Sequence, residues 1–366
     1  MKRGALAIGL CLGLAASGCG GSEDPPAKAP KVFVTPAPEG EPYDQLSDWH
    51  LFENGPSQKP AERVVPYEVI SPLWSDGASK HRFIHLPEGK TIGYSAEDRW
   101  KFPVGSILVK TFGYLHDQRD ASAGERLLET RLLVHESDGW KAHTYVWNDE
   151  QTDAVRKSAG TTLSVSTIDS AGASVTFDYG VPNSTKCSEC HGKDAPDTLG
   201  GKTRQLDRDH DYGKGPENQI DHLYDLGFLD AAPPPAAERV HLTDPMGDAP
   251  VAERARSYLD ANCSHCHETG GSASQSGLQL TWFETAPGTD AATWGVCKVP
   301  TSAGGANCGL VHDIVPGKPE DSVLLCRVKS REPKVQMPPL ATLQEDKNGV
   351  ALLSEWIAQL NEPACP

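Results

Sequence analysis

The residues best suited to chemistry in this chain are two copies of the pattern Cys-x-x-Cys-His. The first is Cys187-Ser188-Glu189-Cys190-His191, and the second is Cys263-Ser264-His265-Cys266-His267. This spacing is typical of c-type haem attachment, because two thiols can bond to the porphyrin and the histidine that follows can ligate its iron. The sequence therefore predicts two covalently bound haem c groups, with His191 on the first iron and His267 on the second.

Three other interpretations of such cysteine pairs compete with this one: a zinc site, a redox dithiol and a structural disulfide. A zinc site needs two pairs acting together and has no use for a histidine after each pair. With 10 Cys and 13 His among 366 residues, two complete copies of the pattern are far less expected by chance than one. We therefore interpret both copies as haem-attachment sites.

The region before the first motif, residues 46–182, is predicted to be β-rich. Strand-forming runs are separated by turns that contain glycine, and two neighbouring pairs of runs read as hairpins. Segments at this spacing favour an antiparallel all-β sandwich or barrel. The predicted strands are 81–86, 106–114, 129–135, 140–147, 162–168 and 174–181.

Residues 183–245 form a small module around the first haem motif. Its one predicted helix covers 216–226, with Gly215 before it and Gly227 after it as start and stop signals. A run of prolines at 233–235 then predicts a stiff linker to the next domain. The multidomain chain thus continues from a β-rich domain into a haem module.

The C-terminal segment, residues 246–366, resembles a class I cytochrome c domain. A helix capped by Asp248 leads directly into the second motif, and a last helix over 350–360 has one apolar face. In the fold that this resembles, the first and last helices cross over the haem, and a loop methionine supplies the distal iron ligand. Met337 is the only methionine after Asp248, and it is predicted to ligate the second iron. Its alternative is a plain core residue.

The sixth ligand of the first haem is not evident from the sequence. A histidine from the β-rich domain, a water or a vacant position would serve as well as the candidates within the module. Lys202 and Arg204 could pair with the propionates of this haem, with solvated surface positions as the alternative. The candidate ligands within the module are His210, His222, His241 and Met246.

The N-terminus predicts export from the cytoplasm. Lys2 and Arg3 precede an apolar stretch too short to span a bilayer. Small residues before Cys19 resemble a bacterial lipoprotein signal over 1–19, with Cys19 as the lipid-modified N-terminus. The alternative is an ordinary signal peptide cleaved nearby.

Two further features refine the predicted location. Gly20 is not the aspartate that retains lipoproteins in the inner membrane, so we expect an outer-membrane lipoprotein of a Gram-negative cell envelope, facing the periplasm or the exterior. Residues 20–45 are rich in proline and glycine and predict a flexible tether between the lipid and the folded chain.

Four cysteines are left after the haem ligands, Cys19 and the signal-peptide Cys11 are assigned. An even number in an oxidising compartment predicts two disulfides. Pairing Cys297 with Cys308 and Cys326 with Cys365 is the simplest of the three connectivities that four cysteines allow, and the sequence does not select one.

Over residues 46–362 the chain resembles a group of uncharacterised bacterial dihaem c-type cytochromes with a β-rich N-terminal half. This resemblance implies haem binding, electron transfer and an envelope location, but no substrate. The chain departs from the group at Pro339, where an acidic residue is more usual. Besides the haem motifs, the matching segments are Pro66-Tyr67, Phe102-Pro103-Val104-Gly105, Glu129-Thr130-Arg131-Leu132-Leu133, Tyr145-Val146-Trp147-Asn148, Arg254-Ala255-Arg256-Ser257-Tyr258-Leu259-Asp260 and Pro316-Gly317-Lys318-Pro319.

Three function classes remain open: an electron carrier, a peroxidase-like dihaem enzyme with an open first haem, and a β-sandwich binding module with accessory haems. The short module around the first motif favours the carrier over an enzyme. A formal charge of −16 argues against nucleic acid as a partner and fits a redox protein with a basic docking patch. Simple solubility explains the charge equally well.

Overall fold

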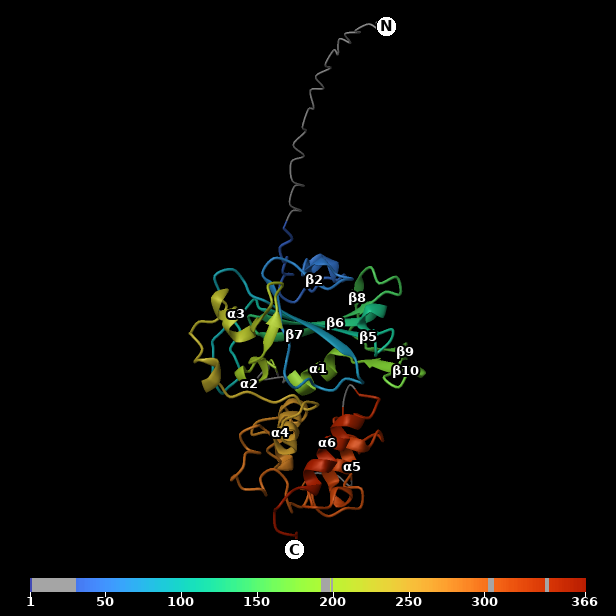
Figure 1. Ribbon diagram of the computed structural model, residues 1–366, viewed down its shortest axis with the longest axis vertical. Coiled ribbons are helices and arrows are strands. Elements are labelled where there is room, and N and C mark those ends of the chain that lie inside the picture. Colours follow the sequence, from blue (N-terminus) through green and yellow to red (C-terminus); the bar gives the residue numbers. More distant parts are fainter. Residues whose placement is uncertain (2–30, 192–197, 199, 302–305, 340–341) are drawn as a thin grey trace. The chain divides into compact units, whose positions relative to one another are not determined.

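The N-terminal half of the chain is organised around one antiparallel sheet of six strands (Figure 1). Strands that are consecutive in the chain are neighbours in the sheet, so the sheet is a meander. The strands are β3 (Val64–Pro66), β4 (Ser79–His85), β5 (Ile107–Leu115), β6 (Glu125–Glu136), β7 (Gly139–Trp147) and β8 (Ala154–Arg156). The computed structural model describes residues 1, 31–191, 198, 200–301, 306–339 and 342–366.

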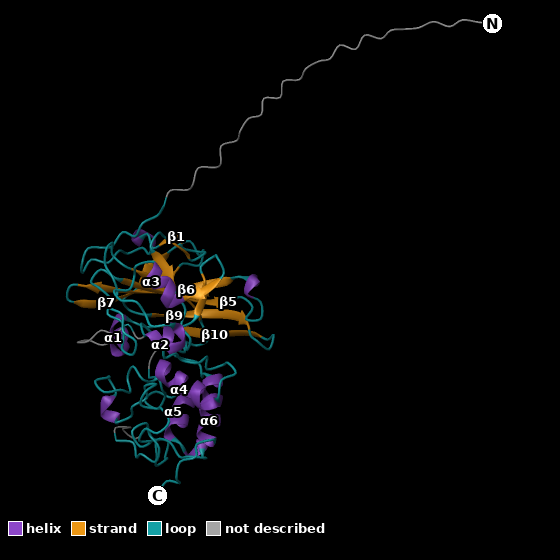
Figure 2. Cartoon of the chain, turned by 60° about the vertical axis from the view of Figure 1, so that its left-hand side comes forward, coloured by secondary structure: helices purple, strands orange, loops and turns teal. Residues whose placement is uncertain are grey.

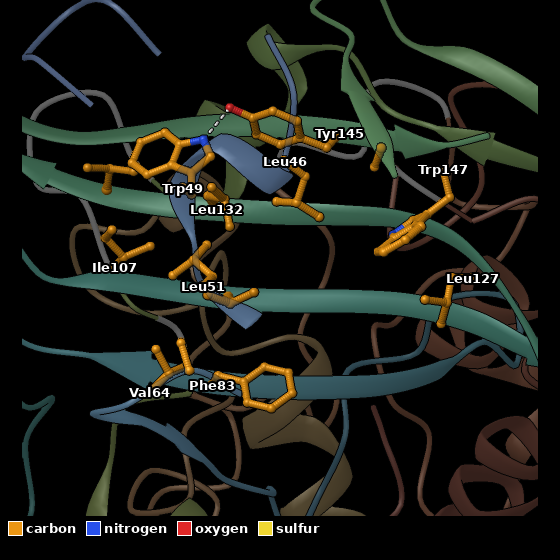
Figure 3. Close-up of a cluster of buried hydrophobic side chains, with 14 residues drawn as sticks. Leu46, Trp49, Leu51, Val64, Phe83, Ile107, Leu127, Leu132, Tyr145 and Trp147 are labelled. Carbon is orange, nitrogen blue, oxygen red and sulfur yellow. Dashed lines mark hydrogen bonds between the residues drawn. The ribbon is translucent and has the colours of Figure 1, made fainter. Parts of the chain in front are cut away.

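One face of this sheet is covered by the segment that precedes it (Figure 3). Trp49 and Leu51 lie over Ile107, Leu132 and Tyr145 of the sheet, and all are almost fully buried. Nε1 of Trp49 donates a hydrogen bond to the Tyr145 hydroxyl at 2.7 Å, so the indole N–H is satisfied inside the core. Two short strands, β1 (Phe52–Asn54) and β2 (Lys59–Pro60), pair within the same segment.

The opposite face of the sheet carries two apolar clusters, one toward each end, and the part between them is not covered by either cluster. At one end the hairpin of β9 (Thr161–Ile168) and β10 (Ser174–Val181) packs on Phe112. At the other end, Ile84 and Leu108 join a second apolar cluster with the module that follows the hairpin. The sequence predicts a sandwich or barrel, whereas the structure has one open sheet and a two-stranded hairpin against it. The predicted hairpins at 129–147 and 162–181 are confirmed.

The module after β10 combines short helices with a two-stranded ribbon. The predicted helix at 216–226 is shorter than expected, because residues 216–218 pair as a strand and Asn218 caps the helix by accepting from Ile220 N at 3.0 Å. Ile220 and Leu223 then enter the apolar cluster of the sheet. The elements are α1 (Ser184–His191), α2 (Thr203–Leu206), β11 (Asp209–Asp211), β12 (Pro216–Asn218) and α3 (Gln219–Asp225).

The C-terminal part contains three helices around a core of their own, α4 (Val251–Asn262), α5 (Val323–Lys329) and α6 (Lys347–Ala358), which Figure 2 shows together. Gly349 of α6 faces Tyr258 of α4, where a Cβ would stand 2.5 Å from the ring. The predicted cap Asp248 is wrong, since α4 begins after Pro250, whereas Asp346 caps α6 by accepting from Gly349 N at 2.9 Å. The single 3-10 turns are Ser47–Trp49, Ala121–Ala123, Ala236–Glu238, Ser274–Ser276 and Pro319–Asp321.

Two disulfides close this C-terminal part, as predicted in number but not in pairing. Cys297 is bonded to Cys365 and Cys308 to Cys326, so the simplest predicted connectivity is wrong. The C-terminal tail passes beside Cys297, which lies within 3.8 Å of the Pro363 carbonyl oxygen. That path places the last cysteine next to the first of the four.

Part of the predicted N-terminal tether packs against the fold. Val32, Val34 and Tyr43 pack against the first core, and Thr35 N donates to Trp49 O at 2.9 Å, so residues 32–45 are not a free tether. By their contacts the chain divides into residues 1–31 and 32–366. The predicted signal peptide, Cys19 and residues 20–30 of the tether lie outside the described residues. Within the described part of the chain, none of the helices has the length and hydrophobicity to cross a membrane.

Candidate functional site

The first Cys-x-x-Cys-His motif lies on α1, which packs beside β7. Asn183 accepts a hydrogen bond from Lys186 N at 3.0 Å, a contact typical of a helix start. Cys187 and His191 are four residues apart and so share one face of the helix. Cys187 is buried and contacts the Thr144 hydroxyl of the sheet. The side chain of Cys190 lies outside the described part of the structure.

The second motif continues directly from the end of α4. Cys263 N donates to Leu259 O and His267 N donates to Cys263 O, both at 2.9 Å, so the motif forms a tight turn. Nδ1 of His267 lies 3.0 Å from the Ser276 hydroxyl. When Nδ1–H donates to that oxygen, the ring orientation is fixed and Nε2 is the nitrogen available to a metal.

The thiols of both motifs differ from those of a reactive dithiol or a disulfide. Cys187 and Cys263 are free thiols, which contradicts a disulfide within either motif. Burial, with the neighbouring Cys266, raises the pKa of the Cys263 thiol to about 12, and burial also raises the pKa of Cys187. A redox dithiol depends on a lowered thiol pKa, so these environments speak against that interpretation.

A porphyrin site makes smaller demands on protein ligands than a bare metal site. Among the described residues, no group of three or more His, Cys, Asp or Glu side chains could hold a metal ion. A haem brings four nitrogen ligands of its own, so the protein supplies only one or two axial ligands. The single histidine of each motif is therefore compatible with haem.

Both motifs border one cavity. Cys187 and His191 line it from α1, and His265 and Cys266 line it from the second motif. The sheet forms another wall, with Leu108, Leu133 and Ala142 among the apolar side chains and Arg82, Lys110 and Arg131 among the charged ones. The volume of this cavity is about 230 Å³, whereas a cavity that holds one buried water needs only ~10–15 Å³. The cavity thus has room for a large, mainly apolar group.

Met337, the predicted distal ligand of the second haem, lies where a shared core brings it near the second motif. Its side chain and that of Cys263 pack against the same apolar cluster, which includes Leu353 and Trp356. Met337 N donates to Arg327 O at 2.8 Å, and the charge of Arg327 also acts on His267. Met337 thus packs in the same core as the second motif, and its role as an iron ligand stays a prediction.

The sequence candidates for the sixth ligand of the first haem lie elsewhere. His222 pairs with Glu217 at 2.9 Å and stacks on Tyr212, and His210 also packs on Tyr212. His241 and Met246 are exposed. None of these four borders the cavity in the described part of the chain, whereas His265 does. Sequence reasoning missed His265 because the two residues between the cysteines are variable spacers in the motif.

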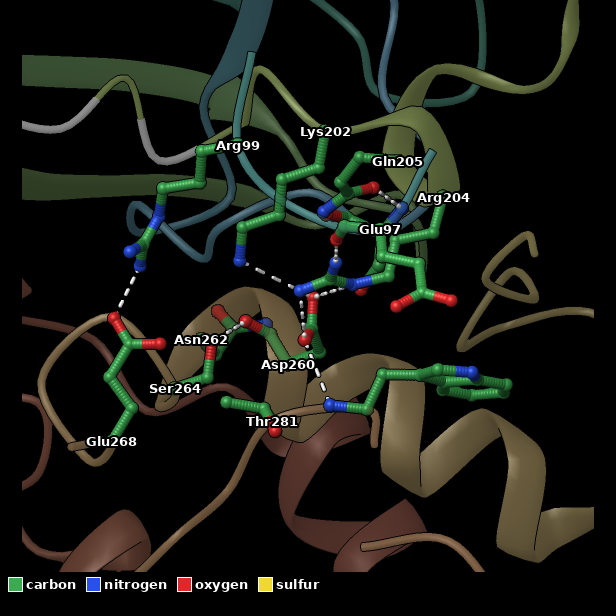
Figure 4. Close-up of polar contacts among 12 residues, drawn as sticks. Glu97, Arg99, Lys202, Arg204, Gln205, Asp260, Asn262, Ser264, Glu268 and Thr281 are labelled. Carbon is green, nitrogen blue, oxygen red and sulfur yellow. Dashed lines mark hydrogen bonds and ion pairs between the residues drawn. The ribbon is translucent and has the colours of Figure 1, made fainter. Parts of the chain in front are cut away.

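Lys202 and Arg204, expected either at the first haem's propionates or in solvent, are instead buried against Asp260 of α4 (Figure 4). Asp260 accepts from Arg204 Nη2 at 3.1 Å, and Lys202 Nζ lies 3.8 Å from its other oxygen. Trp282 N also donates to Asp260, at 2.9 Å. A second ion pair, Arg99 with Glu268, stands beside this cluster. The expected solvated surface positions of Lys202 and Arg204 are therefore wrong, and the two side chains belong to a buried ion-pair cluster with α4.

Comparison of the chain with protein-family models, curated proteins and solved structures finds no match. The resemblance to dihaem c-type cytochromes therefore rests on the segments quoted above and stays a prediction. The arrangement at the cavity is the independent observation: Cys187 and His191 of the first motif and His265 and Cys266 of the second line one partly apolar space.

Proposed function

We propose that this chain is a dihaem c-type cytochrome that carries electrons in the bacterial cell envelope. The observation that carries the proposal is that both Cys-x-x-Cys-His motifs border the same cavity. Haem iron supplies one-electron chemistry by alternating between Fe(III) and Fe(II). A cavity that His191 and Cys187 border from one motif and Cys266 borders from the other would bring two such groups near each other, which suits electron exchange.

For the second haem, Cys263 and Cys266 supply the thioether bonds, His267 the proximal ligand and Met337 the distal one. The Ser276 hydroxyl would hold the His267 ring through Nδ1, and Met337 packs against a buried apolar cluster. A thioether ligand and an apolar surround both favour Fe(II) over Fe(III). We therefore expect this haem to have the higher midpoint potential.

For the first haem, Cys187 and Cys190 supply the thioether bonds and His191 the proximal ligand. His265 is the imidazole that the second motif directs to the same cavity, and we assign it as the sixth ligand. Two axial histidines leave no open iron face for a substrate. This assignment favours the electron carrier over a peroxidase-like enzyme.

Haem content tests the central claim. Full-length chain matured with the c-type assembly machinery should exceed the apoprotein mass by two haems, and its pyridine haemochrome should show the c-type band. Cys187→Ala and Cys263→Ala should each remove one haem. The matched control is Cys308→Ala, an exposed disulfide cysteine outside both motifs, which should keep two haems. One haem or none in the unmodified protein would overturn the proposal.

Electron paramagnetic resonance of the oxidised protein separates the carrier from the enzyme. Two low-spin signals are expected when both irons have six ligands. His265→Ala should convert the first haem to a high-spin signal, while the exposed His241→Ala should change neither. A high-spin first haem in the unmodified protein would favour the enzyme and refute His265 as its ligand.

The remaining parts of the proposal concern place and partner. Lipid on Cys19 would tether the protein to the outer membrane, and two disulfides accord with an oxidising compartment. The excess of acidic residues suits a redox partner with a basic patch.

A further inference from the structure

A row of positive side chains crosses the wall that the sheet presents to the cavity. Arg82 of β4 stands opposite Lys110 of β5, Lys110 stands opposite Arg131 of β6, and Arg131 stands opposite Thr144 of β7. Residues directly opposite in antiparallel strands point to the same face. All four residues line the cavity, so the row forms part of its surface.

One carboxylate serves this row, and it is already engaged. Glu129, fully buried, accepts from Arg131 Nε at 2.8 Å and from the Tyr179 hydroxyl at 2.7 Å. Arg131 is thereby neutralised within the sheet. Glu68, the other acid near Arg82, pairs with Arg208 at 2.9 Å.

Arg82 and Lys110 have no carboxylate partner among the described residues. Arg82, 8% exposed, donates only a long hydrogen bond to Lys80 O, at 3.4 Å. Lys110 Nζ lies over the Phe112 ring, 4.9 Å from its centroid. Burial, together with the charges of Arg82 and Lys80, lowers the pKa of Lys110 well below its ordinary value.

Such an excess of buried positive charge is unfavourable without an anion. Cations taken out of water need opposite charges or hydrogen-bond acceptors to offset their lost hydration. The chain as a whole is acidic, at −16, so the excess is local to this wall. A ligand that brings two negative charges into the cavity would compensate it.

We propose that Arg82 and Lys110 bind the two propionate carboxylates of the first haem. The inference rests on the proposed function, and the geometry indicates how the porphyrin would be oriented along the row. Cys187, a thioether residue, lies at the end of the row beside Thr144 and Arg131. Because neighbouring strands are ~4.8 Å apart, Arg82, which lies two strands from Arg131, stands ~10 Å from it along the row. Porphyrin carries its vinyl groups and its propionates on opposite edges, which matches this order.

Substitution of the two cations tests the inference in the haem-loaded protein. Arg82→Gln and Lys110→Met should both keep two haems, because the thioether bonds are untouched. Loss of a positive charge beside a propionate favours Fe(III). We expect the midpoint potential of the first haem to fall by about 59 mV in each variant, a tenfold change in the one-electron equilibrium. Arg82→Lys should restore the potential, since it restores the charge.

The matched control is Arg126→Gln, on β6 but outside the cavity, where Arg126 pairs with the exposed Asp149. Resonance Raman of the haem propionate bending modes adds a second readout. We expect the frequency of these modes to shift in Arg82→Gln and to stay unchanged in Arg82→Lys. Altered folding alone would not produce that difference between the two variants. Two haems with potentials unchanged in Arg82→Gln and Lys110→Met would overturn this inference and leave the proposed function intact. Absence of haem from the unmodified protein would overturn both.

A diffusible anion is the other source of the same chemistry. If the row binds a free carboxylate or phosphate, added succinate or inorganic phosphate should shift the spectrum of the first haem in the unmodified protein. If the propionates occupy Arg82 and Lys110, neither anion should have an effect. A response to either one that Arg82→Gln abolishes would therefore refute the propionate assignment.

Discussion

Asp260 compensates the buried charges of Lys202 and Arg204. Its replacement by asparagine measures how much these ion pairs contribute to the free energy of unfolding. The exposed fractions of the side chains are 1% for Asp260, 4% for Lys202 and 6% for Arg204. Asp260→Asn keeps the size of the side chain and one oxygen that can accept from Trp282 N. It leaves Lys202 and Arg204 buried with no carboxylate between them.

The expected loss follows from burial. Removing one partner of a buried ion pair costs ~3–5 kcal/mol of unfolding free energy. Because the amide oxygen of asparagine still accepts one hydrogen bond, we expect the lower end, about 3 kcal/mol. Asp44 is the matched control, since it also pairs with an arginine, Arg156, but is 81% exposed. Asp44→Asn should cost less than about 1 kcal/mol.

Urea unfolding of the full-length protein, followed by far-ultraviolet circular dichroism, gives both free energies. Equal slopes against urea concentration would show that the variants change stability rather than the extent of unfolding. A loss for Asp260→Asn no larger than that for Asp44→Asn would refute the reasoning from burial.

The pH dependence of the same difference is a second check. Burial alone would raise the pKa of Asp260, but the charges of Lys202 and Arg204, and the Arg204 hydrogen bond, outweigh it and hold the pKa below its ordinary value. A carboxyl with a lower pKa when folded adds stability above its unfolded pKa of about 3.9, and that stability is lost as pH falls through the folded pKa. The difference between unmodified protein and Asp260→Asn should be constant near neutral pH and shrink only below about pH 4.

Four further outcomes are expected. Gly349→Val should lower the unfolding free energy by about 1–3 kcal/mol, because a Cβ there meets the Tyr258 ring; an unchanged urea midpoint would contradict the close helix contact. Peptide mapping without reduction should recover Cys297 joined to Cys365, and a Cys297–Cys308 peptide would show the pairing to be wrong. Met337→His should abolish the near-infrared sulfur-to-iron band and lower the upper midpoint potential, whereas survival of the band would make Met337 a core residue. Cys19→Ala should move the protein from the detergent phase to the aqueous phase; if the unmodified protein is already aqueous, the lipid prediction fails.

Local signals predicted the parts of the fold that depend on neighbouring residues. The hairpins at β6–β7 and β9–β10 were predictable because alternating strand-formers flank turns with glycine. Helix α1 was not predicted, since the Cys-x-x-Cys-His pattern fills most of its eight residues and leaves no apolar period. The disulfide pairing also escaped prediction, because it depends on the path of the C-terminal tail past Cys297 rather than on spacing.

The site shows the same division between local and long-range information. The two motifs carry the candidate thioether cysteines and histidines in five residues each, so spacing alone identifies them. Arg82, Lys110 and Arg131 are on three strands, and only the register of the sheet brings them together. A sequence signal does exist. Each of the three is a cation inside a predicted strand, and a charged side chain that a strand buries needs a partner.

That register also bears on what the β-rich half contributes. A separate binding module would present its polar side chains to solvent, whereas here a row of cations faces a cavity that both Cys-x-x-Cys-His motifs border. The hairpin and the module after it cover the apolar ends of the same face. The sheet therefore supplies a wall and a positive charge to the candidate site of the first haem. On this reasoning the N-terminal half acts as part of the proposed electron-transfer centre. The module around the first motif can be short because the sheet supplies the rest of the wall around the proposed first haem.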